Sequence, residues 1–356
     1  MRKKKRLPPE VFNIPVTKIK RGYFTDKYFV RSRYILKKDR RHPRVLMQAY
    51  THKSGTLCGM DEAIAILRSC AERGEDLKIR ALYDGDKISA NETVLTIEGD
   101  LATFVHLETV YLGVLCRGSS IATAVRQVAD AAEGKDVLFF SPRFDHYLVQ
   151  EADGYAALMG GAAGVSTDAG GSRLSLPGIG TIPHALIAAY KGDTAASAVA
   201  FERYLPKEVR TIALVDFNND SVGDSLASAR ALGKRLWGVR LDTPHDVRDK
   251  SVKSRAKRTL GVCEELTLNV RKALDAEGFN WVKIVISSGF DAQKVRRFVK
   301  AGVPFDAVGV GMAFYRERME FTADVVKVEG RPCAKVGRTY RPNLRLSLVP
   351  TPKKKL

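Results

Sequence analysis

The sequence predicts an α/β protein with two domains, the second of them barrel-like. Its 356 residues suit roughly two domains of about 100–200 residues each. Hydrophobic residues make up 45% of the chain and charged residues 28%, a composition typical of globular proteins that bury a core. In the second half, short apolar runs that end in small or acidic residues alternate with helical patterns. Such alternation is typical of a parallel sheet that is covered by helices or closed into a barrel.

The N-terminal part of the chain, residues 7–115, reads as a mixed α/β domain. An acidic turn followed by apolar residues at helical spacing predicts a helix over residues 59–69. Turn residues alternate with β-branched residues over 83–97, which predicts a hairpin. Apolar periodicity predicts a long helix over 107–132, broken near Gly118, that leads into the second domain.

The second part of the chain, residues 116–319, carries the pattern of a barrel-like domain. The spacing between its apolar runs leaves room for helices, and the runs predict strands at 137–140, 211–216, 236–242, 282–287 and 306–311. Residues 320–350 read as strands that return to the first domain. The remaining residues, 1–6 and 351–356, are two basic tails that we expect to be solvated and disordered.

The chain is strongly basic, with 59 Lys and Arg residues against 40 Asp and Glu residues. The tails hold only part of this excess, so the folded body is basic as well. A basic body suits small ligands that carry several phosphates. The sequence contains no RNA-recognition signature and no zinc-finger spacing, so any contact with nucleic acid is expected to be incidental.

We also expect a soluble, cytoplasmic protein. No apolar run approaches the ~18 residues of a membrane span, and the basic N-terminus lacks the apolar stretch of a secretory signal. The five cysteines are scattered without a Cys-x-x-Cys pair, which fits a reducing compartment and excludes a disulfide framework.

Polar residues and glycines gather where the predicted strands of the second domain end, and ligands bind at such ends in parallel α/β folds. Asp216 and Asp242 close two strands, and Arg240 lies two residues before Asp242, hence on the same face. These groups would bind ribose hydroxyls, Mg²⁺ or an anion, or else form an internal ion pair. Two glycine sites, at 287–289 and 309–311, would cradle phosphate or simply form tight turns.

His184 follows a glycine-rich loop that contains a proline and precedes an apolar helix. Such a loop suits close approach of a ligand. From the residues alone, a chemical role and a packing or capping role remain equally open.

Seven short motifs carry a resemblance to a known family, in the order 25–28, 140–143, 180–184, 214–216, 239–243, 286–291 and 309–311. Together, over about residues 12–338, the chain resembles the nicotinate phosphoribosyltransferase family, in its short archaeal-type branch. The resemblance implies the type II phosphoribosyltransferase fold, an α/β sandwich domain followed by an incomplete α/β barrel. It also implies that nicotinate and phosphoribosyl pyrophosphate give nicotinate mononucleotide and pyrophosphate, with ATP hydrolysed through a phosphohistidine.

The resemblance implies a role for each matched residue. The pyridine ring would lie between Phe140 and Tyr28 of the partner subunit in a homodimer, and His184 would receive phosphate from ATP. Ser166 falls where relatives that use nicotinamide carry an acidic residue, which favours nicotinate. Arg143 and Arg240 would hold anionic groups. Asp216 and Asp242 would bind ribose hydroxyls, directly or with Mg²⁺. Phosphate would be held by Ser287, Ser288, Gly289, Gly309 and Gly311.

The chain departs from the family pattern at Phe144, where relatives often have a second arginine. Lys335, Arg338 and Arg318 are candidates to replace that charge, and no protein-held metal is expected. Three alternatives stay open: a quinolinate phosphoribosyltransferase, a nicotinamide phosphoribosyltransferase, and a non-catalytic phosphoribosyl- or nucleotide-binding barrel whose tails contact RNA.

Overall fold

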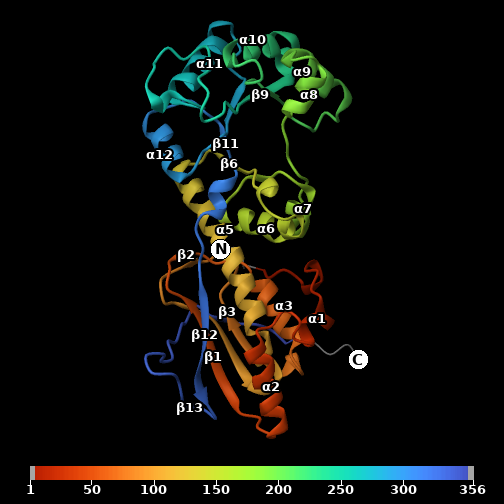
Figure 1. The fold of residues 1–356 in the computed structure, drawn as a ribbon, viewed down its shortest axis with the longest axis vertical. Helices are drawn as coiled ribbons and strands as arrows, with labels where there is room; N and C mark the ends of the chain where they lie inside the picture. The colour runs from red at the N-terminus through yellow and green to blue at the C-terminus, as the bar shows by residue number, and fades with distance from the viewer. Residues whose placement is uncertain (1–4, 352–356) are drawn as a thin grey trace. The chain divides into compact units, whose positions relative to one another are not determined.

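A computed structural model describes residues 5–351 (Figure 1). The chain divides into two compact units, which we call the sandwich unit and the barrel unit. The sandwich unit comprises Met1–Ala124, Tyr155–Gly160 and Glu317–Leu356, and the barrel unit comprises Val125–Gly154 and Gly161–Arg316. The sequence placed these boundaries at 115/116 and 319/320. Most of the two expected tails lies outside the described residues, but Arg6 is described and its guanidinium pairs with Asp61 at 2.8 Å.

The sandwich unit is built on a six-stranded antiparallel sheet in the order β13-β12-β1-β5-β3-β14. Its strands are β1 (Arg44–Thr51), β3 (Lys78–Ala81), β5 (Thr93–Asp100), β12 (Phe321–Val328), β13 (Arg331–Pro332) and β14 (Ser347–Leu348). A two-stranded sheet pairs β2 (Gly55–Thr56) with β4 (Lys87–Ile88). Residues 321–348 thus join the N-terminal strands, and β12 pairs directly with β1.

The helices of the sandwich unit are α1 (Val16–Lys20), α2 (Lys27–Lys38), α3 (Met60–Cys70), α4 (Leu101–Phe104) and the first part of α5 (Glu108–Ala131). Helix α3 begins with two acidic residues, which suit the positive end of its dipole, and buries an apolar stripe in the core. The predicted break near Gly118 is wrong, because α5 is continuous there. Gly118 instead allows close packing, since a Cβ would lie 2.8 Å from the Cys58 carbonyl oxygen.

The barrel unit is a six-stranded parallel sheet in the order β7-β6-β11-β10-β9-β8. Its strands are β6 (Asp136–Phe139), β7 (Gly164–Val165), β8 (Thr211–Leu214), β9 (Leu236–Leu241), β10 (Lys283–Ile286) and β11 (Ala307–Val310). Strands β8 and β11 are buried along their whole length, as expected for strands covered on both sides. Because β7 and β8 are the two ends of the sheet, the barrel is incomplete, as the family resemblance implied.

Helices follow most strands of the barrel unit, as in a half-barrel. They are α6 (Gln150–Gly160, which continues into the sandwich unit), α7 (Asp168–Gly171), α8 (His184–Ala189), α9 (Thr194–Tyr204), α10 (Ser221–Leu232), α11 (Glu264–Ala276) and α12 (Ala292–Lys300). Across residues 5–351, none of the helices combines the length and apolar character that a membrane crossing requires.

Candidate active site

A cavity of about 580 Å³ lies at the carboxyl ends of the barrel strands. Parallel strands deliver the residues that follow them to one edge of the sheet, so segments distant in sequence meet there. Most of the residues singled out from the sequence line this cavity: Phe140, Arg143, Ser166, Arg240, Asp242, Ser287, Ser288, Gly289, Gly309 and Gly311.

A hydrogen-bonded group at the ends of β9 and β10 forms the floor of the site. Arg240 donates to Ser287 Oγ (3.0 Å), Thr181 Oγ1 (2.8 Å) and Asp242 Oδ2 (2.6 Å). Ser287 Oγ in turn donates to Asp242 Oδ1 at 2.7 Å. The guanidinium also lies 5.4 Å from the centre of the Phe140 ring, a cation–π distance. Arg240 and Asp242 therefore form the internal ion pair that the sequence left open as an alternative. Both residues also line the cavity.

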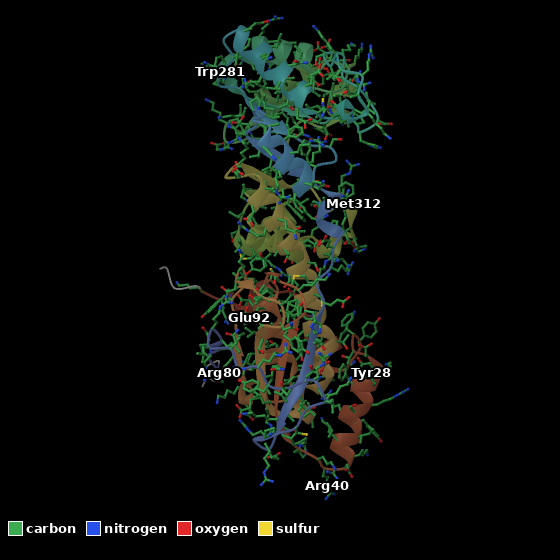
Figure 2. All side chains as sticks on the ribbon, turned by 90° about the vertical axis from the view of Figure 1, so that its left-hand side faces the viewer. Tyr28, Arg40, Arg80, Glu92, Trp281 and Met312 are labelled. Atoms are coloured by element: carbon green, nitrogen blue, oxygen red, sulfur yellow. The ribbon has the colours of Figure 1, made fainter. Side chains whose placement is uncertain are left out.

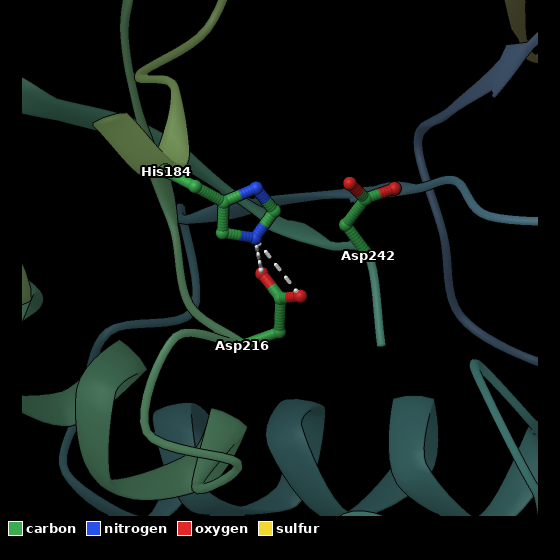
Figure 3. Close-up of side chains that lie close together, drawn as sticks. All are labelled: His184, Asp216 and Asp242. Carbon is green, nitrogen blue, oxygen red and sulfur yellow. Dashed lines mark hydrogen bonds and ion pairs between the residues drawn. The ribbon is translucent and has the colours of Figure 1, made fainter. Parts of the chain in front are cut away.

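His184 and Asp216 form a second pair, at the start of α8 and just after β8 (Figure 3). His184 Nε2 lies 3.0 Å and 3.2 Å from the two carboxylate oxygens of Asp216. The Asp216 side chain is only 4% exposed and the His184 side chain 48%. Burial raises the pKa of Asp216, and nearby Asp242 raises it further, while His184 lowers it. An Nε2–H donor to this carboxylate leaves the lone pair on Nδ1, the ring nitrogen that points away from Asp216.

His184, Asp216 and Asp242 can each offer one ligand atom to a metal ion, and these atoms lie within 4.8 Å of one another. Carboxylate oxygens are the ligands that Mg²⁺ prefers, whereas an imidazole nitrogen suits transition metals. The two aspartates are therefore the pair that fits Mg²⁺. Asp242 also lines the cavity, so an ion held here would lie at the cavity's edge.

The loop between β10 and α12 brings backbone amides to the cavity. Ser288 and Gly289 both have a φ of +70°, and the Asp291 side chain caps α12 by accepting from the Lys294 N–H at 2.9 Å. Successive residues with positive φ before a helix suit phosphate binding.

Lys294 supports this loop from within the protein, a role that the sequence analysis missed. Its ammonium lies 3.4 Å from the Ser288 carbonyl oxygen and 4.1 Å from the centre of the Phe290 ring. Burial and nearby Arg297 lower the pKa of Lys294 to about 8. A cation in the first turn of a helix opposes the helix dipole, so this position in the sequence was a usable signal.

Comparison with known proteins identifies the family. Residues 26–119 match the family described as quinolinate phosphoribosyl transferase, N-terminal domain. The crystal structure of nicotinate-nucleotide pyrophosphorylase from Pyrococcus furiosus superposes with a TM-score of 0.81 at 34% identity, over 96% of this chain and 87% of that one. The chain belongs to the nicotinate phosphoribosyltransferase family. Its fold is that of type II phosphoribosyltransferases, which confirms the expected fold class.

Other members of the nicotinate phosphoribosyltransferase family are more distant. The nicotinate phosphoribosyltransferase of Bacillus subtilis is 26% identical over 237 residues, which is 65% of this chain and 44% of that protein. Human nicotinic acid phosphoribosyltransferase has a TM-score of 0.70 at 16% identity, over 89% of this chain and 77% of that one, which shows a shared fold. The chain spans about half the length of the curated relatives that it matches.

Two groups of residues named from the family resemblance lie in the sandwich unit. Tyr28 lies on α2 with its side chain 60% exposed (Figure 2). The three candidates to replace the second family arginine, Lys335, Arg338 and Arg318, belong to the same unit. Arg338 donates to Tyr50 Oη at 2.6 Å. The additional cation that lines the cavity is Arg316, which the sequence analysis missed.

Proposed function

We propose that this protein is a nicotinate phosphoribosyltransferase of NAD salvage, which makes nicotinate mononucleotide and pyrophosphate from nicotinate and phosphoribosyl pyrophosphate. The observation that carries the proposal is the make-up of one cavity. An aromatic ring (Phe140), an arginine (Arg143) and a glycine-containing loop (288–289) meet there beside two aspartates. The aromatic ring and the arginine match a planar anionic ring, the two aspartates match a ribose, and the loop matches phosphates.

The pyridine nitrogen attacks C1 of the ribose, a new C–N bond forms, and the C–O bond to pyrophosphate breaks. Positive charge develops on the ribose and negative charge on the leaving group, so catalysis is mostly positioning and electrostatic stabilisation. Phe140 holds the ring, and Arg143 holds its carboxylate. Within residues 5–351, the Arg143 side chain makes no hydrogen bond or ion pair, and its guanidinium lies 5.7 Å from the centre of the Phe144 ring. It is thus available to a substrate carboxylate.

The ribose and the leaving group have their own partners in this proposal. Asp242, held in place by Arg240 and Ser287, binds ribose hydroxyls together with Asp216. Asp216 and Asp242 could also hold Mg²⁺, which would supply positive charge to the phosphates. The amides and hydroxyls of residues 287–289 bind phosphate.

ATP hydrolysis is coupled through His184 in this proposal. Nδ1 attacks the γ-phosphorus of ATP, an N–P bond forms, and the bond to ADP breaks. Water later attacks the phosphorus, the N–P bond breaks, and phosphate leaves with the neutral imidazole restored. Asp216 holds Nε2–H and stabilises the positive charge that the ring gains, as a carboxylate does for a catalytic histidine.

Quinolinate is the second candidate substrate, because residues 26–119 match the quinolinate phosphoribosyl transferase family. That match covers part of the sandwich unit and none of the barrel cavity. Quinolinate carries two adjacent carboxylates, yet Arg240 is already bound to three side chains and Arg316 pairs with Asp291 at 3.4 Å. The cavity therefore favours one carboxylate. Ser166, a neutral residue of the lining, favours nicotinate over nicotinamide, because no acidic group opposes the substrate carboxylate there.

The proposal also includes a homodimer, in which Tyr28 of the partner subunit covers the pyridine ring, and a cytoplasmic location. The exposed aromatic side chains Tyr23, Phe24, Tyr28 and Tyr34 around α2 support the first of these. No disulfide joins the five cysteines, all of which lie within residues 5–351, and this supports a reducing compartment.

Pyrophosphate release tests the proposal. Purified protein with phosphoribosyl pyrophosphate and Mg²⁺ should release pyrophosphate only when nicotinate is added, and ATP should increase the rate. Phe140→Ala should raise the KM for nicotinate about tenfold or more. No nicotinate-dependent release, with or without ATP, would overturn the proposal.

A further inference from the structure

Two glycines at the end of β11 have their side-chain space filled by aromatic rings. A Cβ on Gly309 would lie 2.5 Å from two ring carbons of Phe140, and a Cβ on Gly311 would lie 2.4 Å from Phe144 Cε2. Neither glycine has a positive φ, so a left-handed backbone does not account for them. The close approach of the two rings is what requires glycine at both positions.

The segment that carries the two rings is tied to the same strand end. The Phe140 N–H donates to the Val310 carbonyl oxygen at 2.8 Å, and Ser141 Oγ donates to the Gly311 carbonyl oxygen at 3.0 Å. Backbone and ring contacts together therefore set the positions of Phe140 and Phe144. Both rings line the cavity, and Phe144 remains 41% exposed there.

We propose that Phe144, seated on Gly311, is a specificity-determining residue that forms a second aromatic wall of the cavity and restricts it to a ring with one carboxylate. Gly309 and Gly311 then make room for the two aromatic rings, an arrangement that we call the ring seat, and residues 287–289 bind phosphate. The inference rests on the proposed function, whose ring-binding cavity it describes in more detail.

The selectivity follows from the charges around Phe144. Arg143 lies over its ring at 5.7 Å and is the guanidinium available to the first carboxylate. A second, adjacent carboxylate would face the uncharged ring and lose its hydration without gaining a partner, which is costly. Met312, which also lines the cavity, adds a further apolar side chain.

A double-mutant cycle with Gly311→Ala and Phe144→Ala tests the seating of the ring. Nicotinate binding to the full chain is measured by calorimetry without phosphoribosyl pyrophosphate, and KM values for both substrates are measured separately. Gly311→Ala should weaken nicotinate binding roughly tenfold and change the KM for phosphoribosyl pyrophosphate less than about twofold. In the Phe144→Ala background, Gly311→Ala should have almost no further effect, because the ring that it displaces is gone.

Two further variants complete the experiment: a matched control, and a variant that we expect to bind quinolinate more tightly. Gly113→Ala on α5, where an added Cβ meets nothing within 4 Å, should leave binding unchanged. Phe144→Arg should bind quinolinate more tightly than the wild type does. An equal effect of Gly311→Ala in both backgrounds would overturn the seating, and wild-type binding of quinolinate as tight as that of nicotinate would overturn the selectivity.

The outcome also separates this inference from the proposed function. Nicotinate binding that follows the expected cycle, in a protein without transferase activity, would support the ring seat and overturn the proposed function. Wild-type protein that fails to bind nicotinate would overturn both.

Discussion

The two ring nitrogens of His184 have different roles. The buried Asp216 carboxylate fixes Nε2, and Nδ1 points away from it (Figure 3). In the proposed mechanism, this arrangement presents one nitrogen, in one orientation, to a phosphoryl donor.

His184→Ala should therefore abolish ATP hydrolysis and the stimulation of product formation by ATP. A slower, ATP-independent transfer should remain, because the ring and ribose contacts are intact. His42→Ala is the matched control, since His42 forms a 2.8 Å pair with Asp100 in the sandwich unit. Both activities are measured on variants shown to be folded by circular dichroism. ATP stimulation that survives in His184→Ala would contradict the phosphohistidine.

We expect Lys294 to lower the stability of the fold and to strengthen binding of phosphoribosyl pyrophosphate. Its pKa is about 8 in the folded protein and 10.5 ordinarily, so the unfolded chain binds more protons between these pH values. Stability should therefore rise with pH through this window, and below pH 8 the full cost is present. Lys294→Met should raise the free energy of unfolding at pH 7 by about 2–3 kcal/mol, an advantage that shrinks from pH 8 upwards and is gone above pH 10.5.

The same substitution should weaken binding of phosphoribosyl pyrophosphate, because an ammonium beneath the Ser288 carbonyl is lost. We expect its KM to rise several-fold while the KM for nicotinate changes little. Lys300→Met, at the other end of α12, is the control for loss of a charge. Urea unfolding at pH 7 and pH 10 measures stability. A variant that is less stable at pH 7, with unchanged KM values, would show that Lys294 is only a packing residue.

At the scale of elements, Arg6 connects the first described residues to the start of α3. Arg6 pairs with Asp61 at 2.8 Å and donates to the carbonyl oxygens of Leu82 and Ala81. The Asp61 side chain is only 4% exposed, so removal of Arg6 would leave a buried carboxylate without its cation. The Leu7 N–H, which donates to Asp61 Oδ2 at 2.8 Å, carries no compensating charge. Arg6→Ala should reduce the free energy of unfolding by about 3–5 kcal/mol. Thermal unfolding of Arg6→Ala and of the control Lys5→Ala checks this, and equal melting temperatures would contradict it.

The elements also show what the sequence could predict. The strands of the barrel unit and the polar groups at their ends followed from apolar runs and alternation, as Arg240 and Asp242 illustrate. The helix break predicted at Gly118 was wrong, because a glycine within a helix pattern fits both a break and a close contact. Phe144 was noted only as the position of a missing arginine, and Thr181 and Lys294 were not recognised as parts of the site. Phe144 contacts Gly311 and Thr181 contacts Arg240, so both contacts join segments from different strands that meet only in the folded barrel.

At the scale of the whole molecule, the proposed site needs two copies of the chain. If Tyr28 of the partner subunit covers the ring, Tyr28→Ala and Phe140→Ala damage the same site from different chains. Co-expression of the two variants should give mixed dimers with one intact site, and so about a quarter of wild-type activity. Each variant alone should keep about a tenth or less of wild-type activity at nicotinate concentrations below KM. A co-expressed sample no more active than either variant, or an active monomer in sedimentation, would contradict the shared site.

The most direct test of the central claim is a competition between the candidate substrates. Wild-type protein is incubated with equal concentrations of nicotinate, nicotinamide and quinolinate, together with phosphoribosyl pyrophosphate, Mg²⁺ and ATP, and the products are measured by mass spectrometry. Among the described residues that line the cavity, Arg143 is the guanidinium without a carboxylate partner. Together with the neutral Ser166, it predicts that nicotinate is consumed first, at least about tenfold faster than either competitor, without release of carbon dioxide. Faster consumption of quinolinate or nicotinamide, or no consumption of any pyridine, would contradict the account.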